Sequence, residues 1–225
     1  MARADSTDIE GMVNEICSHL GSLSIVNAES MRAIRRDFSK RLATAEPEVV
    51  IKVALKLIER PGLENRFIAY ELVSHHTASL HSLKARDLER FGLGMDNWAA
   101  VDTFGCYLSG PVWREGQVSD KLIHGWARSK DRWWRRVALV STVPLNNRAR
   151  GGAGDTDRTL QICKMLAADR DEMVVKAMSW ALRELAKRDP KAVKKFLAEN
   201  EKTLAARVLR EVRNKLSTGL KNPRR

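Results

Sequence analysis

The sequence predicts an all-α protein, an α-solenoid of HEAT-like (ARM-like) helical repeats with a basic concave face. Apolar residues recur at steps of three and four through almost all of the 225 residues, and no stretch alternates with a period of two. The connections between the helical segments are mostly short, and successive helix pairs give a repeat of about 40 residues. We expect one domain over residues 1–225. An irregular helical bundle is the alternative architecture, because the repeats are too diverged for self-similarity to reveal them.

The first half of the chain holds a close succession of predicted helices. A capping box, Thr7-x-x-Glu10, precedes the first helix. The glycines of Gly92–Gly94 interrupt the helical pattern, and Asp96 or Asn97 then offers an N-cap for the next helix. The apolar spacing predicts helices near residues 9–20, 31–42, 47–57, 63–75, 82–91 and 96–108.

The second half continues the helical pattern, with one interruption. Residues 143–157 are rich in Gly, Asn and Asp after Pro144 and are predicted to form a long flexible loop. Residues 218–225 are predicted to be a loose basic tail. The apolar spacing predicts helices near residues 118–126, 133–140, 156–168, 171–187, 191–200 and 203–217.

The charge of the chain is unevenly distributed along the sequence. The formal net charge is +12, with 40 Lys or Arg against 28 Asp or Glu. Residues 1–120 carry 14 basic and 17 acidic side chains, whereas residues 121–225 carry 26 basic and 11 acidic ones. One strongly basic half favours a polyanionic partner such as nucleic acid. A basic protein that is merely soluble is the alternative interpretation.

Several classes of protein are disfavoured by the sequence. No apolar run reaches the length of about 18 residues that a membrane-spanning helix needs, and the first residues lack the apolar core of a secretory signal. Cys17, Cys106 and Cys163 are an odd number of widely spaced cysteines, so we expect no disulfide framework and a reducing cytosol. The histidines lack metal-ligand spacing, and no glycine-rich phosphate-binding motif is present, so we expect no metal and no cofactor.

The segment 171–187 places a tryptophan among cations. On a helical wheel Trp180 lies roughly 130° from the centre of the apolar arc, beside Lys176, Arg183 and Lys187. An aromatic ring among three cations suits contact with a phosphate backbone and with a sugar or base. Packing of Trp180 on another helix is the alternative. The apolar arc consists of Val174, Ala177, Met178, Ala181 and Leu185.

The segment 96–109 pairs a tryptophan with a carboxylate. Trp98 and Asp102 are four residues apart and therefore share one helix face, with the small Gly105 one turn further on. A ring and a carboxylate together suit a pocket for a cationic group. A surface aspartate beside a packed tryptophan is the alternative.

The segment 131–142 interleaves aromatic and guanidinium groups. Trp133 and Trp134 lie beside Arg132, Arg135 and Arg136, an arrangement that fits contact with nucleic acid. In the alternative interpretation one tryptophan belongs to the core and the arginines are solvated.

At these segments the sequence resembles the AlkD family of HEAT-like-repeat DNA alkylation repair proteins, which are alkylpurine DNA glycosylases. The resemblance covers roughly residues 30–217 and is clear from about residue 90 onward. It is carried by Asn97-Trp98-Ala-Ala-Val-Asp102, by Trp133-Trp134-Arg135-Arg136-Val-Ala-Leu, and by Lys176-Ala-Met-Ser-Trp180-Ala-Leu-Arg183-Glu184-Leu-Ala-Lys-Arg-Asp-Pro190.

The resemblance implies a role for several of these residues. Asp102 matches the catalytic aspartate of the family, Trp98 and Trp180 match the aromatic pair that flanks the lesion nucleotide, and Arg136 matches an arginine that contacts DNA. The implied activity is hydrolysis of the N-glycosidic bond of cationic 3-methyladenine and 7-methylguanine in duplex DNA. The further cations that we expect to contact DNA are Arg132, Arg135, Lys176, Arg183 and Lys187.

Two alternatives remain open at this point. The family's Gly-Val-x-x-Pro element reads here Ser24-Ile25-Val26-Asn27-Ala28, without its Gly and Pro. This departure favours a non-catalytic HEAT-like DNA-binding protein, whereas the retained Asp102 favours the enzyme. A protein-interaction scaffold is the other common use of an α-solenoid. For the enzyme we expect a cytoplasmic monomer that associates with the bacterial nucleoid while acting, that uses neither metal nor cofactor, and that binds no membrane.

Overall fold

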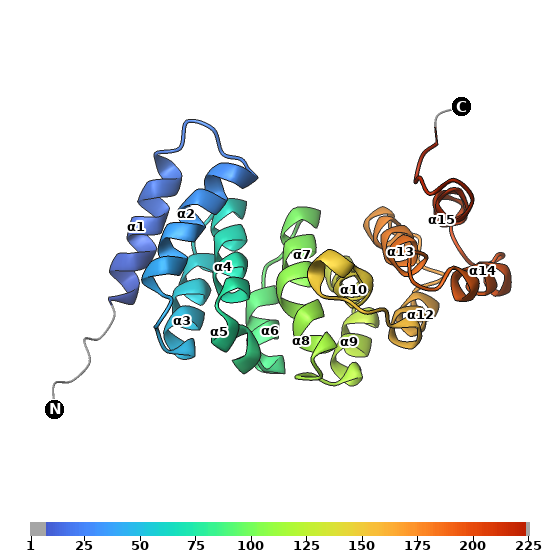
Figure 1. Cartoon of the computed structure of the whole chain (residues 1–225), viewed down its shortest axis with the longest axis horizontal. Coiled ribbons are helices and arrows are strands. Elements are labelled where there is room, and N and C mark those ends of the chain that lie inside the picture. The colour runs from blue at the N-terminus through green and yellow to red at the C-terminus, as the bar shows by residue number, and fades with distance from the viewer. Residues whose placement is uncertain (1–7, 224–225) are drawn as a thin grey trace. The chain divides into compact units, whose positions relative to one another are not determined.

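A computed structural model describes residues 8–223 of the chain. These residues form two compact units, Met1–Leu93 and Gly94–Arg225, which are treated separately below (Figure 1). Helices account for the regular structure of the described range, and no strand occurs within it. The prediction of a single domain over residues 1–225 stays a prediction, and so does the concave face.

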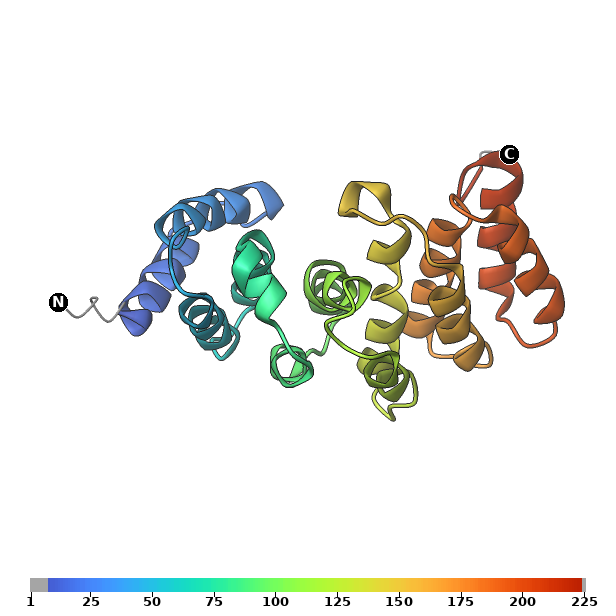
Figure 2. The same cartoon turned by 60° about the horizontal axis from the view of Figure 1, so that its bottom comes forward.

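In the first unit, helices contact both the next helix along the chain and the helix after that. Within it α1 contacts α2 and α3, and α4 contacts α2, α3 and α5. This layering of successive pairs is the packing of an α-solenoid. Figure 2 shows the same helices lying side by side in a second view. The elements are α1 (Ile9–Gly21), α2 (Ala28–Arg41), α3 (Pro47–Ile58), α4 (Leu63–His75), α5 (Thr77–Ser82) and α6 (Ala85–Gly92).

The second unit has the same pattern of contacts. Within it α10 contacts α7 and α13, and α13 contacts α15, so that these helices form one layer. A second layer includes α9 and α12, which contact each other and α10. The elements are α7 (Trp98–Phe104), η1 (Gly105–Ser109), α8 (Gly110–Arg114), α9 (Asp120–Ala127), α10 (Arg132–Val140), α11 (Val143–Asn146), η2 (Arg148–Arg150), α12 (Thr156–Met165), α13 (Glu172–Leu185), α14 (Pro190–Glu199) and α15 (Ala206–Thr218).

The first helices differ from the sequence prediction in detail. Thr7 of the predicted capping box lies outside the described residues, and the side chain of Asp8 instead accepts a 2.8 Å hydrogen bond from the backbone N–H of Gly11. The helix predicted near residues 82–91 is present as α6, which begins at Ala85, whereas the short helix α5 before it was not predicted. Leu83 and Lys84, both with extended backbone angles, separate α5 from α6.

The segment 143–157, predicted to be a flexible loop, contains two short helices, so that prediction is wrong in part. Pro144 occupies the first turn of α11, where its missing N–H costs no hydrogen bond. The buried side chain of Asn146 then fixes the segment. Its amide nitrogen donates to Thr159 at 2.8 Å, and its oxygen accepts from the backbone of Asp155 at 3.0 Å.

The predicted loose tail is held, as far as it is described, against α15. The Nζ of Lys221 lies 3.5 Å from Oε2 of Glu211, and the side-chain amide of Asn214 donates to the Lys221 carbonyl at 3.1 Å. Glu211 is buried, and its carboxylate pairs with Lys221 and with arginines of α15. The end of the predicted tail, residues 224–225, lies outside the described residues.

Candidate functional site

The candidate site begins at the N-terminus of α7. The side-chain oxygen of Asn97 caps this helix by accepting a 3.0 Å hydrogen bond from the backbone N–H of Ala100. Trp98, the first helical residue, is 58% exposed. Asp102 lies one turn later, and its side chain is 19% exposed. The ring and the carboxylate therefore lie on one face of α7.

The helix that carries Asp102 continues into a wider turn. Residues Gly105–Ser109 form the π-helix η1, where the backbone N–H of Gly110 donates to the carbonyl of Gly105. Pro111 gives the physical reason. A proline ring inside an α-helix clashes with the carbonyl four residues earlier, and the wider turn relieves that clash.

Two glycines allow this helix to approach α10 closely. A Cβ atom on Gly105 would lie 2.6 Å from a methyl carbon of Val140, and one on Gly110 would lie 2.8 Å from the carbonyl oxygen of Ser141. Both separations are shorter than real Cβ contacts, so a larger residue at either glycine would force η1 and α8 away from their neighbours. The close approach brings Asp102 within reach of side chains on α10.

Asp102 is held by a two-pronged ion pair. The Nε of Arg136 on α10 donates to Oδ1 of Asp102 at 2.9 Å, and Nη2 donates to Oδ2 at 2.8 Å. The third direction of the guanidinium is used as well, because Nη1 donates to the backbone carbonyl of Met173 on α13. The Arg136 side chain is 6% exposed. This arginine therefore connects α7, α10 and α13 at Asp102.

The carboxylate keeps some capacity to act on a ligand. Burial raises the pKa of Asp102 above its ordinary value of 3.8, and the hydrogen bonds and charge of Arg136 oppose that rise. Each oxygen of an ionised carboxylate has two lone pairs, and the arginine takes one hydrogen-bond site on each. The remaining sites can accept from a water molecule or face a positive charge.

Trp180 lies on α13, outside its apolar arc. The arc predicted from the sequence is the buried side of the helix, whereas Trp180 itself is half-buried. Within the described part of the chain its ring makes no hydrogen bond and no ring stacking contact. It lies on the same helix as Met173, whose carbonyl binds Arg136.

The three cations predicted around Trp180 have different surroundings. The Nζ of Lys176 pairs with Glu172 at 2.8 Å, and that of Lys187 pairs with Glu184 at 2.7 Å. Both lysine side chains are more than a third exposed, so these surface pairs contribute little to stability and can exchange for phosphate. Arg183 is half-buried, and burial lowers its pKa.

The arginines of α10 are also unlike one another. Arg132 is exposed, and its guanidinium lies 4.8 Å from the centroid of the Trp133 ring. Arg135 is half-buried, and its Nε donates to Oδ2 of Asp169 at 2.7 Å. Arg136 is buried on Asp102 as described above. DNA contact by Arg135 and Arg136 stays a prediction, and within the protein each already has a carboxylate partner.

The second tryptophan of the pair on α10 is a packing residue. The ring centroid of Trp134 lies 5.0 Å from that of Trp126 and 6.3 Å from that of Phe104. Trp126 and Phe104 are buried. Trp134 therefore belongs to the aromatic cluster beneath α7, as the alternative interpretation of this segment allowed.

Sequence reasoning missed the contact that defines the site. Arg136 was assigned to DNA and Asp102 to catalysis, but their mutual ion pair joins residues 34 positions apart and has no local signature. The wide turn did have a signal, because Pro111 interrupts an otherwise helical apolar pattern. Met173 had none, since it contributes its backbone carbonyl.

Other kinds of chemistry have little support in the described range. Burial raises the pKa of Cys106, in η1, to about 12, so its thiol is protonated at neutral pH. Residues 8–223 contain no group of three or more His, Cys, Asp or Glu that could hold a metal ion. No helix in the same range is long and apolar enough to cross a membrane.

Comparison with known proteins finds a protein family and a solved structure that are similar to this chain. The family described as DNA alkylation repair enzyme matches residues 2–216. A solved structure described as a predicted DNA alkylation repair enzyme from Enterococcus faecalis is 16% identical, with a TM-score of 0.69 over 97% of this chain and 99% of that one. At this identity the likeness shows the fold, and it confirms the predicted α-solenoid class. No curated protein matches the sequence significantly.

Proposed function

Because this chain belongs to the DNA alkylation repair enzyme family, we propose that it is a DNA glycosylase for cationic alkylated purines, 3-methyladenine and 7-methylguanine, in duplex DNA. The observation that carries the proposal is the partly exposed Asp102 carboxylate, fixed by Arg136 one helical turn from the exposed ring of Trp98. The reaction is hydrolysis of the N-glycosidic bond between the alkylated base and its sugar.

The chemistry of this substrate calls for a carboxylate. An alkylated purine carries a positive charge and leaves readily, so the base needs no protonation. Departure of the base produces an oxocarbenium-like sugar, which a fixed negative charge stabilises. Asp102 supplies that charge, and an oxygen lone pair not engaged by Arg136 orients the attacking water. The cationic base leaves with the bonding electrons as a neutral purine. The water's oxygen forms the new bond to the sugar and releases one proton to the solvent.

The aromatic residues have a complementary role in the proposal. Trp98 presents its ring at the mouth of the site, and Trp180 presents a half-buried ring on α13. An aromatic face attracts a cation and stacks on a sugar or base. The two rings would therefore favour the cationic nucleotide and exclude bulk water from Asp102.

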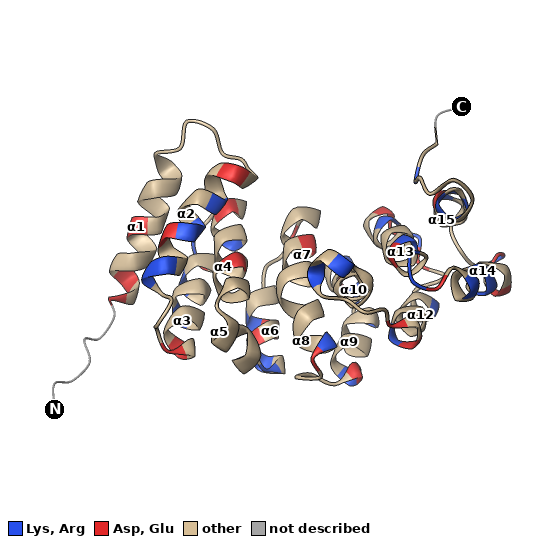
Figure 3. Cartoon of the chain, in the orientation of Figure 1, with Lys and Arg blue, Asp and Glu red and all other residues tan. Residues whose placement is uncertain are grey.

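Cations around these residues would hold the DNA backbone. Arg132 and Lys187 are exposed, and Lys176 and Arg183 lie on the same helix as Trp180. Figure 3 shows Lys and Arg on both α10 and α13. Phosphate contacts of this kind bind duplex DNA with little sequence preference. Arg136 would support the site through Asp102, whereas Arg135 is engaged by Asp169.

The two-pronged ion pair also favours a second candidate function, DNA binding without base release. In that case Arg136 neutralises Asp102 permanently, and the pair serves only to join α7, α10 and α13. The two candidates differ in whether removal of the Asp102 charge affects a chemical step.

The test is release of 7-methylguanine from N-methylated duplex DNA by the wild type and by Asp102→Asn. We expect release per folded molecule to fall by at least about 100-fold, or about 2.7 kcal/mol of transition-state stabilisation. Asp102→Asn also leaves Arg136 without a charged partner, so its effect on folding needs a matched control. Asp169→Asn is that control, because it removes the partner of the neighbouring Arg135.

We expect Asp169→Asn to lower stability by a similar amount and to keep release within about threefold of the wild type. Equal release by wild type and Asp102→Asn would contradict the glycosylase proposal. DNA binding that persists in both proteins while neither releases base would support the second candidate.

A further inference from the structure

Helices α14 and α15 form a groove that the proposed function does not use. The groove has a volume of about 330 Å³, which is near the lower end of the range of about 300–1,000 Å³ that is typical of ligand sites. Apart from Glu201, which follows α14, its residues come from one face of each helix at spacings of three and four. The lining residues are Lys194, Leu197, Ala198, Glu201, Arg213, Leu216 and Ser217.

The groove has an apolar floor and a charged rim. Leu197, Ala198 and Leu216 supply the apolar surface. Nearby, Leu220 is 57% exposed and lies four residues beyond Leu216. A floor of this kind suits the apolar face of a helix whose side chains repeat at three- and four-residue steps.

The charge around the groove selects the partner. Residues 190–223 carry nine Lys or Arg and three Asp or Glu. The three carboxylates already have basic partners: Glu199 pairs with Lys195, Glu201 with Arg213, and the buried Glu211 with several cations. Among the described residues Lys191, Lys194 and Lys202 have no acidic partner. The surplus positive charge therefore complements an acidic ligand.

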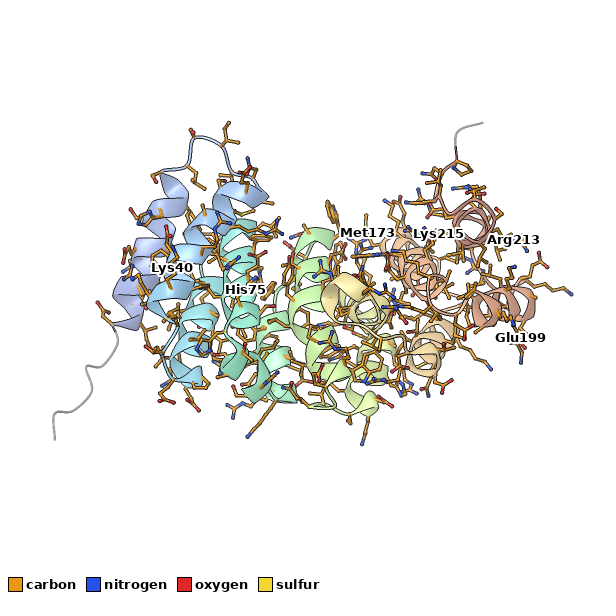
Figure 4. The ribbon with its side chains drawn as sticks, in the orientation of Figure 1. Lys40, His75, Met173, Glu199, Arg213 and Lys215 are labelled. Carbon is orange, nitrogen blue, oxygen red and sulfur yellow. The ribbon has the colours of Figure 1, made fainter. Side chains whose placement is uncertain are left out.

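The groove also faces away from the proposed DNA site within its unit. Figure 4 shows Lys215 on the side of α15 nearer to Met173, and Arg213 on the opposite side, towards α14 and Glu199. Arg213 lines the groove, whereas Met173 belongs to the Asp102 site. A ligand in the groove therefore approaches another side of α15.

We propose that the groove between α14 and α15 binds an acidic amphipathic helix of a partner protein. Bulky apolar residues of that helix, spaced by three and four, fill the floor formed by Leu197, Ala198 and Leu216. Acidic residues on its flanks meet Lys194 and the neighbouring lysines. Duplex DNA fits less well, because an apolar floor gives phosphates no contact.

The probe is a fluorescein-labelled helical peptide of about 18 residues, with leucines at spacings of three and four on one face and glutamates elsewhere. Its binding to the full chain is measured by fluorescence anisotropy. A peptide of the same composition with its leucines scattered around the helix is the control ligand. We expect saturable binding of the first peptide and at least about tenfold weaker binding of the second.

Three variants separate binding in the groove from general attraction to a basic protein. Leu216→Glu should weaken binding by at least about tenfold, because it places a charge on the floor. Lys194→Glu should weaken peptide binding by at least about threefold. Lys195→Glu makes the same change in net charge outside the groove, and its fold-loss of affinity should be less than half as large. All three variants should melt near the wild-type temperature and bind DNA as the wild type does.

Three outcomes would overturn the proposal. Equal effects of Lys194→Glu and Lys195→Glu would mean that only overall charge matters. If a short DNA duplex displaced the peptide, and if the Leu216→Glu variant also failed to bind that duplex, the groove would be a DNA-binding surface. Self-association in sedimentation that Leu216→Glu abolishes would make a second copy of this chain the occupant.

Discussion

Glu71 in the first unit and Asp102 in the second are both carboxylates fixed by arginine, but their surroundings differ. Glu71, on α4, is 1% exposed and receives two guanidiniums, with Nε of Arg32 at 2.9 Å and Nε of Arg35 at 3.2 Å. Asp102, on α7, is 19% exposed and receives only Arg136. Glu71 is enclosed and doubly neutralised, which suits a structural role. Asp102 is open on one side and singly neutralised, as a carboxylate must be if it acts on a ligand.

The comparison is tested most strongly at Glu71. Glu71→Gln leaves two arginines beside a neutral amide, and we expect it to lower the free energy of unfolding by about 3–5 kcal/mol, because it breaks a buried ion pair from one side. Urea unfolding measures the change. Glu48→Gln, at an exposed position of α3, should stay within about 0.5 kcal/mol of the wild type.

Base release per folded molecule should be unaffected by Glu71→Gln. Loss of release without loss of stability would reverse the assignment, since it would give Glu71 the chemical role and leave Asp102 as the structural carboxylate.

The pH dependence of base release sharpens the comparison at Asp102. The carboxylate must be ionised to stabilise a sugar cation, and burial raises its pKa. Release should therefore fall on the acid side around a pH above the 3.8 of an ordinary aspartate, and it should be fully present above that range. Arg136 lowers this pKa, so Arg136→Gln should move the acid limb to higher pH.

A pH–rate profile of the wild type and of Arg136→Gln, taken on prefolded protein, checks this expectation. If base release falls at the same acid pH in Arg136→Gln as in the wild type, the titrating group is not Asp102.

The smallest expected effect on stability concerns Trp180. Because the ring is half-buried and lies outside the apolar arc of α13, Trp180→Ala should cost less than about 1.5 kcal/mol of unfolding free energy. Trp113→Ala, at a fully buried ring, should cost about 3–5 kcal/mol. Thermal melts compare the two variants.

Base release per folded molecule should show the opposite order, with the larger loss in Trp180→Ala and the smaller in Trp113→Ala. The reason is that stacking on a sugar or base is worth about 1–3 kcal/mol. A large stability loss in Trp180→Ala with normal release would make this tryptophan an ordinary packing residue.

Local sequence patterns predict the helices well, but they predict the contacts between helices poorly. The apolar arc of α13 is buried as its spacing predicted, and Asn97 caps α7 as one of its two candidates. The spacing of Trp98 and Asp102 was readable for the same reason, since both lie on one helix. The partner of Asp102 was not readable, because it comes from another helix through the close approach at Gly105 and Gly110.

The errors in the irregular segments have a related cause. Gly, Asn and Asp in residues 143–157 favour turns, and they led to the prediction of a flexible loop. In the structure Asn146 uses the same hydrogen-bonding capacity to bind Thr159 and Asp155. Polar residues that terminate helices thus also fix a connection, and their partners decide which role they play.

The direction in which the Asp102 carboxylate points depends on the number of residues in the π-helix that follows it, rather than on the types of those residues. Each residue advances an α-helix by about 100°. Deleting one residue from Gly105–Ser109 would turn this stretch into a regular α-helix and rotate α7 by that angle relative to α8, whose Trp113 is anchored in the core. Asp102 would then swing away from Arg136 even though every side chain of the site remained. Insertions and deletions in this stretch should therefore be far more damaging than substitutions at its solvent-facing positions.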